Sequence, residues 1–222
     1  MSVYEIFLFV HVIAFVYWLG ADIGVFYAAG YAVKPELSRE TRLTVIEIMA
    51  WVDQFPRVCV PTIAAVGAVV GVAGGYFVFD PAWLWLVGAI ALGWVAMILY
   101  LYVNRRKPEK IGWLATVDVW FRTGVLIVVA GLGVAALAGH GVTDQPWLAI
   151  KLLIFALAIL FSLMTRFLFH PFKLASARLR AGTSTAQDDA DMRTALARAR
   201  LPILGIWAMT LAAAAIGLWK PV

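Results

Sequence analysis

Long apolar stretches dominate the hydropathy pattern of the chain, and short polar segments separate them. A helix needs about 20 apolar residues to cross a hydrocarbon layer of about 30 Å. Six stretches reach this length, at residues 3–29, 58–79, 81–103, 113–139, 147–171 and 201–219. The pattern therefore predicts an all-α fold, a polytopic membrane helical bundle with six transmembrane helices, in which residues 1–222 form a single integral membrane domain.

Two of the segments between the predicted spans are long enough to have structure of their own. In residues 34–57, Ser38 is a predicted helix N-cap and Pro56 a predicted break, so an amphipathic helix is expected between them. This helix either lies flat at the membrane interface or extends the second span as a kinked helix. Residues 172–200 contain the only linker-like stretch of the chain, at 182–191, before an arginine-rich lead into the sixth span.

Basic residues gather on one side of the predicted membrane. Fifteen of the eighteen Lys and Arg residues lie in the connections 30–57, 104–112 and 166–200, and the connections at 80 and 140–146 hold none. Cytoplasmic loops carry the excess of Lys and Arg in membrane proteins. We therefore expect both termini outside (N-out and C-out), with segments 34–57 and 172–200 in the cytoplasm.

The composition agrees with a protein that uses the lipid bilayer as its solvent. Hydrophobic residues make up 64% of the chain and charged residues only 14%, whereas a soluble domain is about a quarter charged. A soluble enzyme, a disordered regulator and a disulfide scaffold are thus excluded, the last because Cys59 is the only cysteine. The net charge of +5 does not indicate nucleic acid, because the basic residues sit between apolar runs as topology requires.

Few ionisable side chains fall inside the predicted spans, and charge is costly in hydrocarbon, so each is a functional candidate. His11, Phe15, Trp18 and Asp22 follow one another at intervals of 4, 3 and 4 residues. This spacing puts them on one face of the first helix, which we expect to point into the bundle.

Asp118 and Arg122 are one helical turn apart in the fourth span and are expected to pair. Arg122 lies at about the depth of Asp22, so we expect it to bridge Asp118 and Asp22. The pair is either a structural ion pair or an anion or proton site, including an anchor for a substrate carboxylate.

Lys151 and His11 are predicted at similar depths near the ends of their helices. Lys151 is either an interfacial anchor whose ammonium reaches the headgroups or the partner of a bound anionic group. Haem b needs an axial ligand in an apolar slot and cations for its propionates, which His11 and Lys151 could supply. His140 is either a solvated loop residue or a second axial ligand, and His170 is expected at the C-terminus of the fifth span.

Three segments carry a resemblance to a known family. They are segment 4–20, with His11 early and Trp18-Leu-Gly20 later; segment 147–153, Trp-Leu-Ala-Ile-Lys-Leu-Leu; and the ending, where an arginine-rich linker precedes Leu201-Pro202 and the chain closes with Lys220-Pro221. In these segments the chain resembles HemJ-type membrane proteins and the CopD-like proteins related to them. The resemblance covers about two thirds of the chain.

The resemblance implies porphyrin chemistry in the bacterial inner (plasma) membrane. HemJ-type proteins are protoporphyrinogen oxidases thought to hold haem b, and their first-helix histidine and their lysine correspond to His11 and Lys151. CopD-like relatives are associated with copper uptake and tolerance. HemJ-type proteins have four spans, so residues 81–139, which bring Asp118 and Arg122, look like an insertion. Whether this chain is itself an enzyme is therefore left open.

These observations support three hypotheses. The first is a haem-b-binding redox protein, for electron transfer or porphyrinogen oxidation, with a quinone or a membrane redox partner. In it His11 is the axial ligand, Phe15 and Trp18 pack the macrocycle, and Lys151 and Arg122 supply cations. The second is a CopD-like copper transport or tolerance protein with His11 and His140 as ligands. The third is a non-catalytic accessory subunit of a respiratory or photosynthetic complex.

Small residues at four-residue spacing in the second span, Gly67, Gly71 and Gly75, allow close helix packing. This packing occurs either within the bundle or at the face of a homo-oligomer.

Overall fold

The computed structural model describes residues 1–220 and consists of helices joined by short connections. Six helical segments are long and apolar enough to cross a membrane, with α2 and α3 counted as one. The predicted all-α polytopic bundle is therefore confirmed, and no strand occurs among residues 1–220. The helices are α1 (Val3–Ala32), α2 (Arg39–Val52), α3 (Gln54–Ala73), α4 (Trp83–Val103), α5 (Pro108–Leu137), α6 (Pro146–Leu168), α7 (His170–Ala181) and α8 (Ala186–Trp219).

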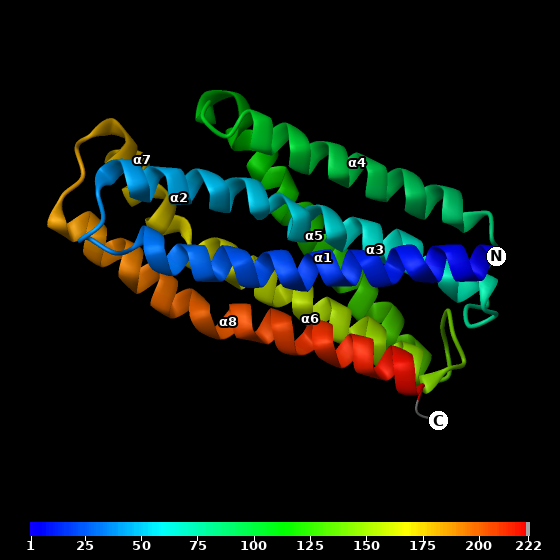
Figure 1. Cartoon of the computed structure of the whole chain (residues 1–222). Coiled ribbons are helices and arrows are strands. Elements are labelled where there is room, and N and C mark those ends of the chain that lie inside the picture. Colours follow the sequence, from blue (N-terminus) through cyan, green and yellow to red (C-terminus); the bar gives the residue numbers. More distant parts are fainter. Residues whose placement is uncertain (221–222) are drawn as a thin grey trace.

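The six long segments run side by side (Figure 1), and their contacts connect them in a closed ring. Around the ring, α4 packs on α3, α3 on α1, α1 on α8, α8 on α6, α6 on α5, and α5 on α4. The α1–α8 and α4–α5 contacts are much less extensive than the other four. The bundle is thus two groups of three helices, α1, α3, α4 and α5, α6, α8, that meet along two looser seams.

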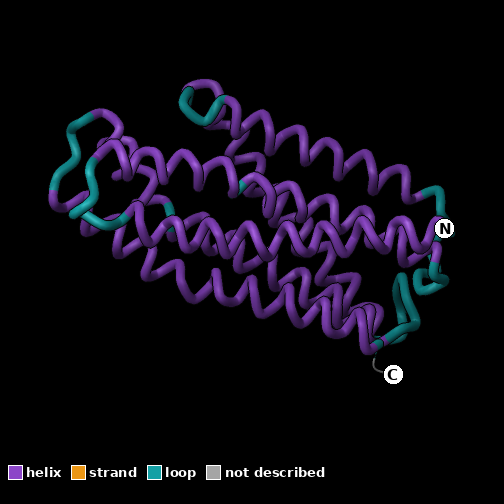
Figure 2. The backbone as a smooth tube through the Cα atoms, in the orientation of Figure 1, coloured by secondary structure: helices purple, strands orange, loops and turns teal. Residues whose placement is uncertain are grey.

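The start of α1 and the end of α8 lie at one end of the bundle, together with the connections 74–82 and 138–145 (Figure 2). We call this the terminal end. The connections that carry most of the basic residues lie at the opposite end, which we call the basic end. These two helix ends therefore share a side, as the charge pattern predicts. Which side faces the cytoplasm stays a prediction.

The second span is shorter than the hydropathy predicts. The predicted limit was residue 79, but α3 ends at Ala73. Gly75 has a φ of 70°, a conformation open to glycine at little cost. The amides of Tyr76 and Phe77 then both donate to the Gly71 carbonyl, at 2.8 and 3.1 Å. The apolar residues 76–79 therefore belong to a connection, not to the span.

Segment 34–57 is a kinked extension of the second span, one of the two predicted alternatives. Ser38 caps α2 by accepting a hydrogen bond from the Thr41 amide at 3.2 Å, as predicted. The break between α2 and α3 falls at Asp53. The predicted break at Pro56 was wrong, because Pro56 lies in the first turn of α3, where a missing amide proton removes no helical hydrogen bond.

The helices that contain the last two predicted spans have other limits than the hydropathy suggests. The helix of the fifth span ends at Leu168, and His170 is the first residue of α7 instead of the last of the span. The helix of the sixth span begins at Ala186, so the predicted span 201–219 is the second part of a longer helix. Thr185 and Asp188 form a capping box there, and this local signal overrides the polar composition of residues 186–191.

Beyond the membrane-crossing part, a helical platform stands at the basic end. It consists of α2, α7 and residues 186–199 of α8, packed on the end of α1 around an apolar cluster with Met192 and Phe172 at its centre. Arg42 ties it together by donating to the Ala32 carbonyl at 2.9 Å and to Asp189 at 2.7 Å. The 34 residues of α8 span about 51 Å, more than a hydrocarbon layer of about 30 Å.

The main core lies inside the ring. Its buried members come from α1, α3, α4, α6 and α8, and partly buried residues of α5 pack against them. The buried members include Trp18, Cys59, Trp94, Ile159, Leu163 and Ile206. This core separates two groups of ionisable side chains, one toward each end of the bundle.

Candidate functional site

His11 is held between α1 and α3 and does not face lipid. Its ring lies against Gly67, where an added Cβ would come within 3.0 Å of the imidazole Cε1. The ring also approaches the backbone carbonyl of Ile63. Its Nδ1 is buried and has no hydrogen-bond partner among residues 1–220. A buried imidazole nitrogen without a partner is uncommon, which makes it the strongest ligand candidate of the chain.

Lys151 reaches from α6 to α8 near the terminal end. A Cβ at Gly217 would lie 2.7 Å from its Nζ, so the ammonium packs against α8. Its charge acts on the imidazole of His11, which places the two groups in electrostatic range of one another. No ion pair or hydrogen bond of Lys151 occurs within the described part of the chain. We call these two residues the His11–Lys151 pair.

The aromatic members of the predicted stripe have different surroundings. Trp18 is almost fully buried in the core and meets Phe155 edge-on, with ring centroids 6.1 Å apart. Phe15 is half-buried, one turn from His11. Trp18 thus has a packing role that needs no bound group, and contact of either ring with a macrocycle stays a prediction.

The other two histidines lie outside the membrane-crossing helices. His140 is exposed in the connection after α5, at the same end as His11. His170 is exposed at the start of α7, at the basic end. No group of three or more His, Cys, Asp or Glu side chains that could hold a metal ion occurs within residues 1–220.

The second group of ionisable side chains is a buried ion-pair cluster nearer the basic end. The two carboxylate oxygens of Asp118 share the single Nε–H of Arg122, at 3.0 and 3.1 Å, and Asp118 also accepts a hydrogen bond from Arg166 Nη1. Arg166 also donates to the Ala115 carbonyl at 2.9 Å. The exposed fraction of the Asp118 side chain is only 1%. We call Asp118, Arg122 and Arg166 the Asp118 cluster.

The predicted bridge between Arg122 and Asp22 is not formed. Asp22 instead accepts a hydrogen bond from Trp207 Nε1 at 2.7 Å. The reason is the ring order: α8 stands beside α1, whereas α1 and α5 are not neighbours among the described residues. Arg57, at the start of α3, forms an ion pair with Asp53 at 2.6 Å.

Arg166 is the partner of Asp118 that the sequence pattern missed. An i,i+4 spacing signals Arg122, but Arg166 comes from another helix, 48 positions along the chain. The sequence offered one hint of this pairing, which is that Arg166 lies close to the end of α6. That position sets the depth of the Arg166 guanidinium in the membrane.

Two hydrogen-bond donors beside the Asp118 cluster have no partner in the described part of the chain. One is Arg122 Nη2 and the other is Trp94 Nε1 on α4, and both atoms are buried. The guanidinium carbon of Arg122 lies 5.2 Å from the centre of the Trp94 ring. Both groups donate only, so a matching ligand must supply acceptors.

Lys173 of α7 lies at the basic end of this region. Its side chain is accessible, but loss of hydration beside the packed helices, and then the charges of Arg57 and Arg166, lower the pKa of Lys173 to about 8. The charged form of Lys173 is therefore less stable in this place than it would be in water.

At the terminal end, an aromatic box closes the bundle. Lys220 donates to the Tyr76 hydroxyl at 2.7 Å and lies over the Tyr76 and Trp147 rings. This hydrogen bond lowers the pKa of Tyr76 and raises the pKa of Lys220. Thr143 donates to the Tyr76 carbonyl at 2.6 Å, so the box joins two connections and the end of α8 next to the His11–Lys151 pair.

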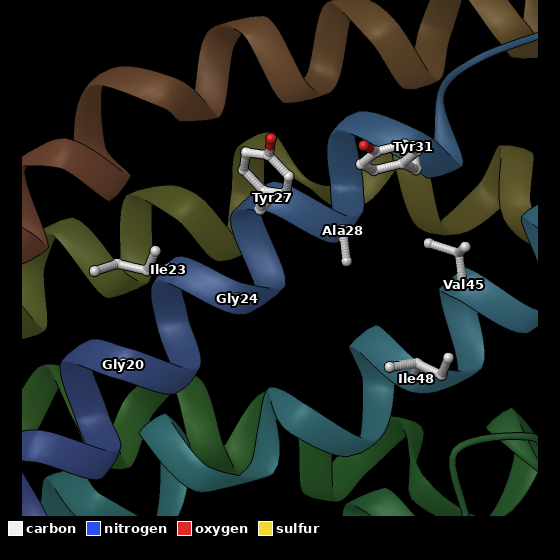
Figure 3. Close-up of a pocket in the computed structure, with 8 residues that line it drawn as sticks. All are labelled: Gly20, Ile23, Gly24, Tyr27, Ala28, Tyr31, Val45 and Ile48. Atoms are coloured by element: carbon white, nitrogen blue, oxygen red, sulfur yellow. The ribbon is translucent and has the colours of Figure 1, made fainter.

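A surface groove of about 540 Å³ runs between α1 and α2 (Figure 3). Its floor is Gly20, Gly24 and Ala28, with Tyr27 and Tyr31 at its rim. Gly20 is nine residues from His11, or about 14 Å along the helix. The groove is therefore separate from the His11–Lys151 pair.

Neither protein-family models nor curated proteins nor solved structures give any match to this chain. The resemblance to HemJ-type and CopD-like proteins therefore stays a prediction, and the candidate sites must be judged on their own chemistry.

Proposed function

We propose that this multi-pass membrane protein is a redox protein that binds haem b at the terminal end of the bundle, in a bacterial inner membrane. The observation that carries the proposal is the buried Nδ1 of His11, which has no hydrogen-bond partner among residues 1–220. A neutral imidazole nitrogen in apolar surroundings is a preferred axial ligand of haem iron.

The residues around His11 fit the chemistry of that group. Gly67 has no side chain, and this leaves room for the imidazole itself to pack against α3. Lys151 brings an ammonium into range of the ring with no counter-charge in the described residues, and a propionate would supply one. Phe15, half-buried one turn away, offers an apolar face. Arg122 belongs to the Asp118 cluster, so Lys151 is the cation this proposal depends on.

In this proposal each residue has one task. His11 would hold the iron, Lys151 would hold one propionate, and the surrounding helices would keep water away. Haem b supplies one-electron chemistry between two iron oxidation states. A quinone or a membrane redox partner would receive the electron. Oxidation of a porphyrinogen is the enzymatic form of this proposal, and simple electron transfer is the other form.

The first experiment is a visible spectrum of protein purified from haem-supplied cells. We expect a Soret band that shifts on addition of dithionite, with α and β bands appearing. The chain offers a matched set of variants, because it has three histidines. His11→Ala should lose the bands, while His170→Ala, a change at the opposite end, should keep them. His140→Ala tests the second axial ligand.

A colourless protein, or equal loss of the bands in His11→Ala and His170→Ala, would contradict the proposal. A colourless protein that binds copper would support the copper hypothesis, in which His11 and His140 are ligands. A colourless, metal-free protein that co-purifies with a large complex would support the accessory-subunit hypothesis.

A second experiment tests Lys151. Lys151→Met keeps the apolar stem but removes the charge, so we expect about tenfold weaker haem retention, the scale of one charge-assisted hydrogen bond. The control is Lys173→Met, at the basic end. Equal retention in both variants would show that Lys151 holds no propionate. Adding protoporphyrinogen and a quinone to the haem-loaded protein then separates an oxidase from an electron carrier.

A further inference from the structure

We propose that the protein has an intramembrane binding site for a small monovalent anion between α4 and α5, formed by Arg122 and Trp94. This site is separate from the His11–Lys151 pair and does not rest on the proposed redox function. Lys151 is about 7 Å from the start of α6 and Arg122 about 22 Å from the end of α5, both measured from the terminal end.

The first argument is the pair of unpartnered donors. Arg122 Nη2 and Trp94 Nε1 are both buried without a hydrogen-bond partner within residues 1–220. The exposed fractions of the two residues are 5% and 3%. A buried donor without a hydrogen-bond partner destabilises the fold, and more so when it is charged. Two such donors on neighbouring side chains are most simply explained by a shared acceptor.

The second argument is charge. Within the Asp118 cluster, two guanidinium groups share one carboxylate, which leaves one positive charge without a partner. Arg57 also acts on Arg122, but it is paired with Asp53 and does not change this count. Asp22 does not contribute here, because it is held by Trp207 on α8. A single negative charge would balance the cluster.

The third argument is the place of the site. Trp94 and Phe121 meet across the α4–α5 seam, with ring centroids 5.1 Å apart. This seam is one of the two loose contacts of the ring. An anion of one or a few atoms that bound to Arg122 and Trp94 would therefore not have to separate a tightly packed helix pair.

The test is thermal unfolding of the detergent-solubilised full chain at constant ionic strength. Sodium formate and sodium chloride are the probes, and sodium gluconate, whose anion is too large for the seam, is the reference. We expect a saturable rise in Tm with formate and chloride but not with gluconate, because a ligand of the native state stabilises it by mass action.

Trp94→Phe is the decisive variant. It keeps an aromatic ring against Phe121 but removes the indole donor, so the apparent affinity for formate should fall about tenfold, the effect of one hydrogen bond to a charged acceptor. The matched control is Trp120→Phe, a change of an exposed tryptophan on α5, which should leave the affinity unchanged. The proposal is overturned if formate and gluconate act alike, as they would if water satisfied both donors. Equal effects of the two variants would also overturn it.

Discussion

The two groups of ionisable side chains inside the bundle satisfy their charges in opposite ways. In the Asp118 cluster, one carboxylate is held by two arginines, and Arg166 has a further backbone partner. In the His11–Lys151 pair, neither side chain has an ion-pair partner in the described part of the chain, and His11 Nδ1 has no hydrogen bond. The first group is held together by ion pairs, although one positive charge is left over. The second consists of the unpaired groups on which the haem proposal rests.

The comparison predicts that removal of a charge lowers Tm in the Asp118 cluster and raises Tm at Lys151. Groups that stabilise one another cannot be removed singly without cost, whereas an unpaired cation in apolar surroundings is a burden on the fold. Functional sites often contain groups that lower the stability of the fold. The following predictions test this difference, and all four are measured on the full chain in the same detergent.

The largest effect is expected from Asp118→Ala, which leaves two guanidinium groups without their carboxylate. Loss of one member of a buried ion pair costs about 3–5 kcal/mol, so Tm should fall strongly. The control is Asp144→Ala, in an exposed connection, which should have little effect. If both variants unfold at the same temperature, the Asp118 cluster does not hold α5 to α6.

The next largest effect is expected from Gly67→Ala. The added Cβ would lie 3.0 Å from His11 Cε1, so the ring must move or the α1–α3 contact must open. Overpacking of this kind costs about 1–3 kcal/mol, and any haem spectrum should shift with the ring. Gly131→Ala is the matched control, because nothing lies within 4 Å of its added Cβ. Equal Tm values would show that His11 is not tightly held.

Lys151→Met should raise Tm in the absence of haem, by the equivalent of about 1 kcal/mol, because it removes a poorly hydrated cation. The same variant should retain haem more weakly, so stability and binding move in opposite directions. A lower Tm in Lys151→Met would place Lys151 with the structural ion pairs and abolish the contrast between the two regions.

The smallest effect is a pH dependence from Lys173. Its folded pKa of about 8 is below the unfolded value of about 10.4. Between these values the unfolded chain binds more protons, so this group makes stability rise with pH from about 8 to about 10.4. The Tm advantage of Lys173→Met over the parent chain should therefore shrink across this range. A constant difference would mean that neither lost hydration nor the neighbouring arginines lower the pKa of Lys173 in the folded protein.

Hydropathy and helical spacing were sufficient to predict the helices and the side chains that face inward. They identified the spans, the cap at Ser38, the Asp118–Arg122 pair and the inward position of His11, because each depends on a few neighbouring residues. They failed at helix ends, where Gly75 and the Thr185 capping box override apolar or polar composition.

Contacts between helices could not be predicted from depth alone. Arg122 and Asp22 lie at similar depths, but their helices are not adjacent, so Trp207 takes the place expected for Arg122. The pairing of Asp118 with Arg166 and the meeting of Arg122 with Trp94 depend on the same ring order. The order itself comes from the packing of six similar apolar surfaces, which carry no local signal of their partners.

The helix α8 is continuous from the platform at the basic end to the terminal end of the bundle. Its 34 residues run from the platform to the residue before Lys220, with Pro202 as the one position where the proline ring removes a backbone hydrogen bond. Over about 51 Å, a tilt of about one degree displaces the far end by about 0.9 Å. A tilt of α8 at the platform would therefore displace Gly217, the residue that packs against Lys151.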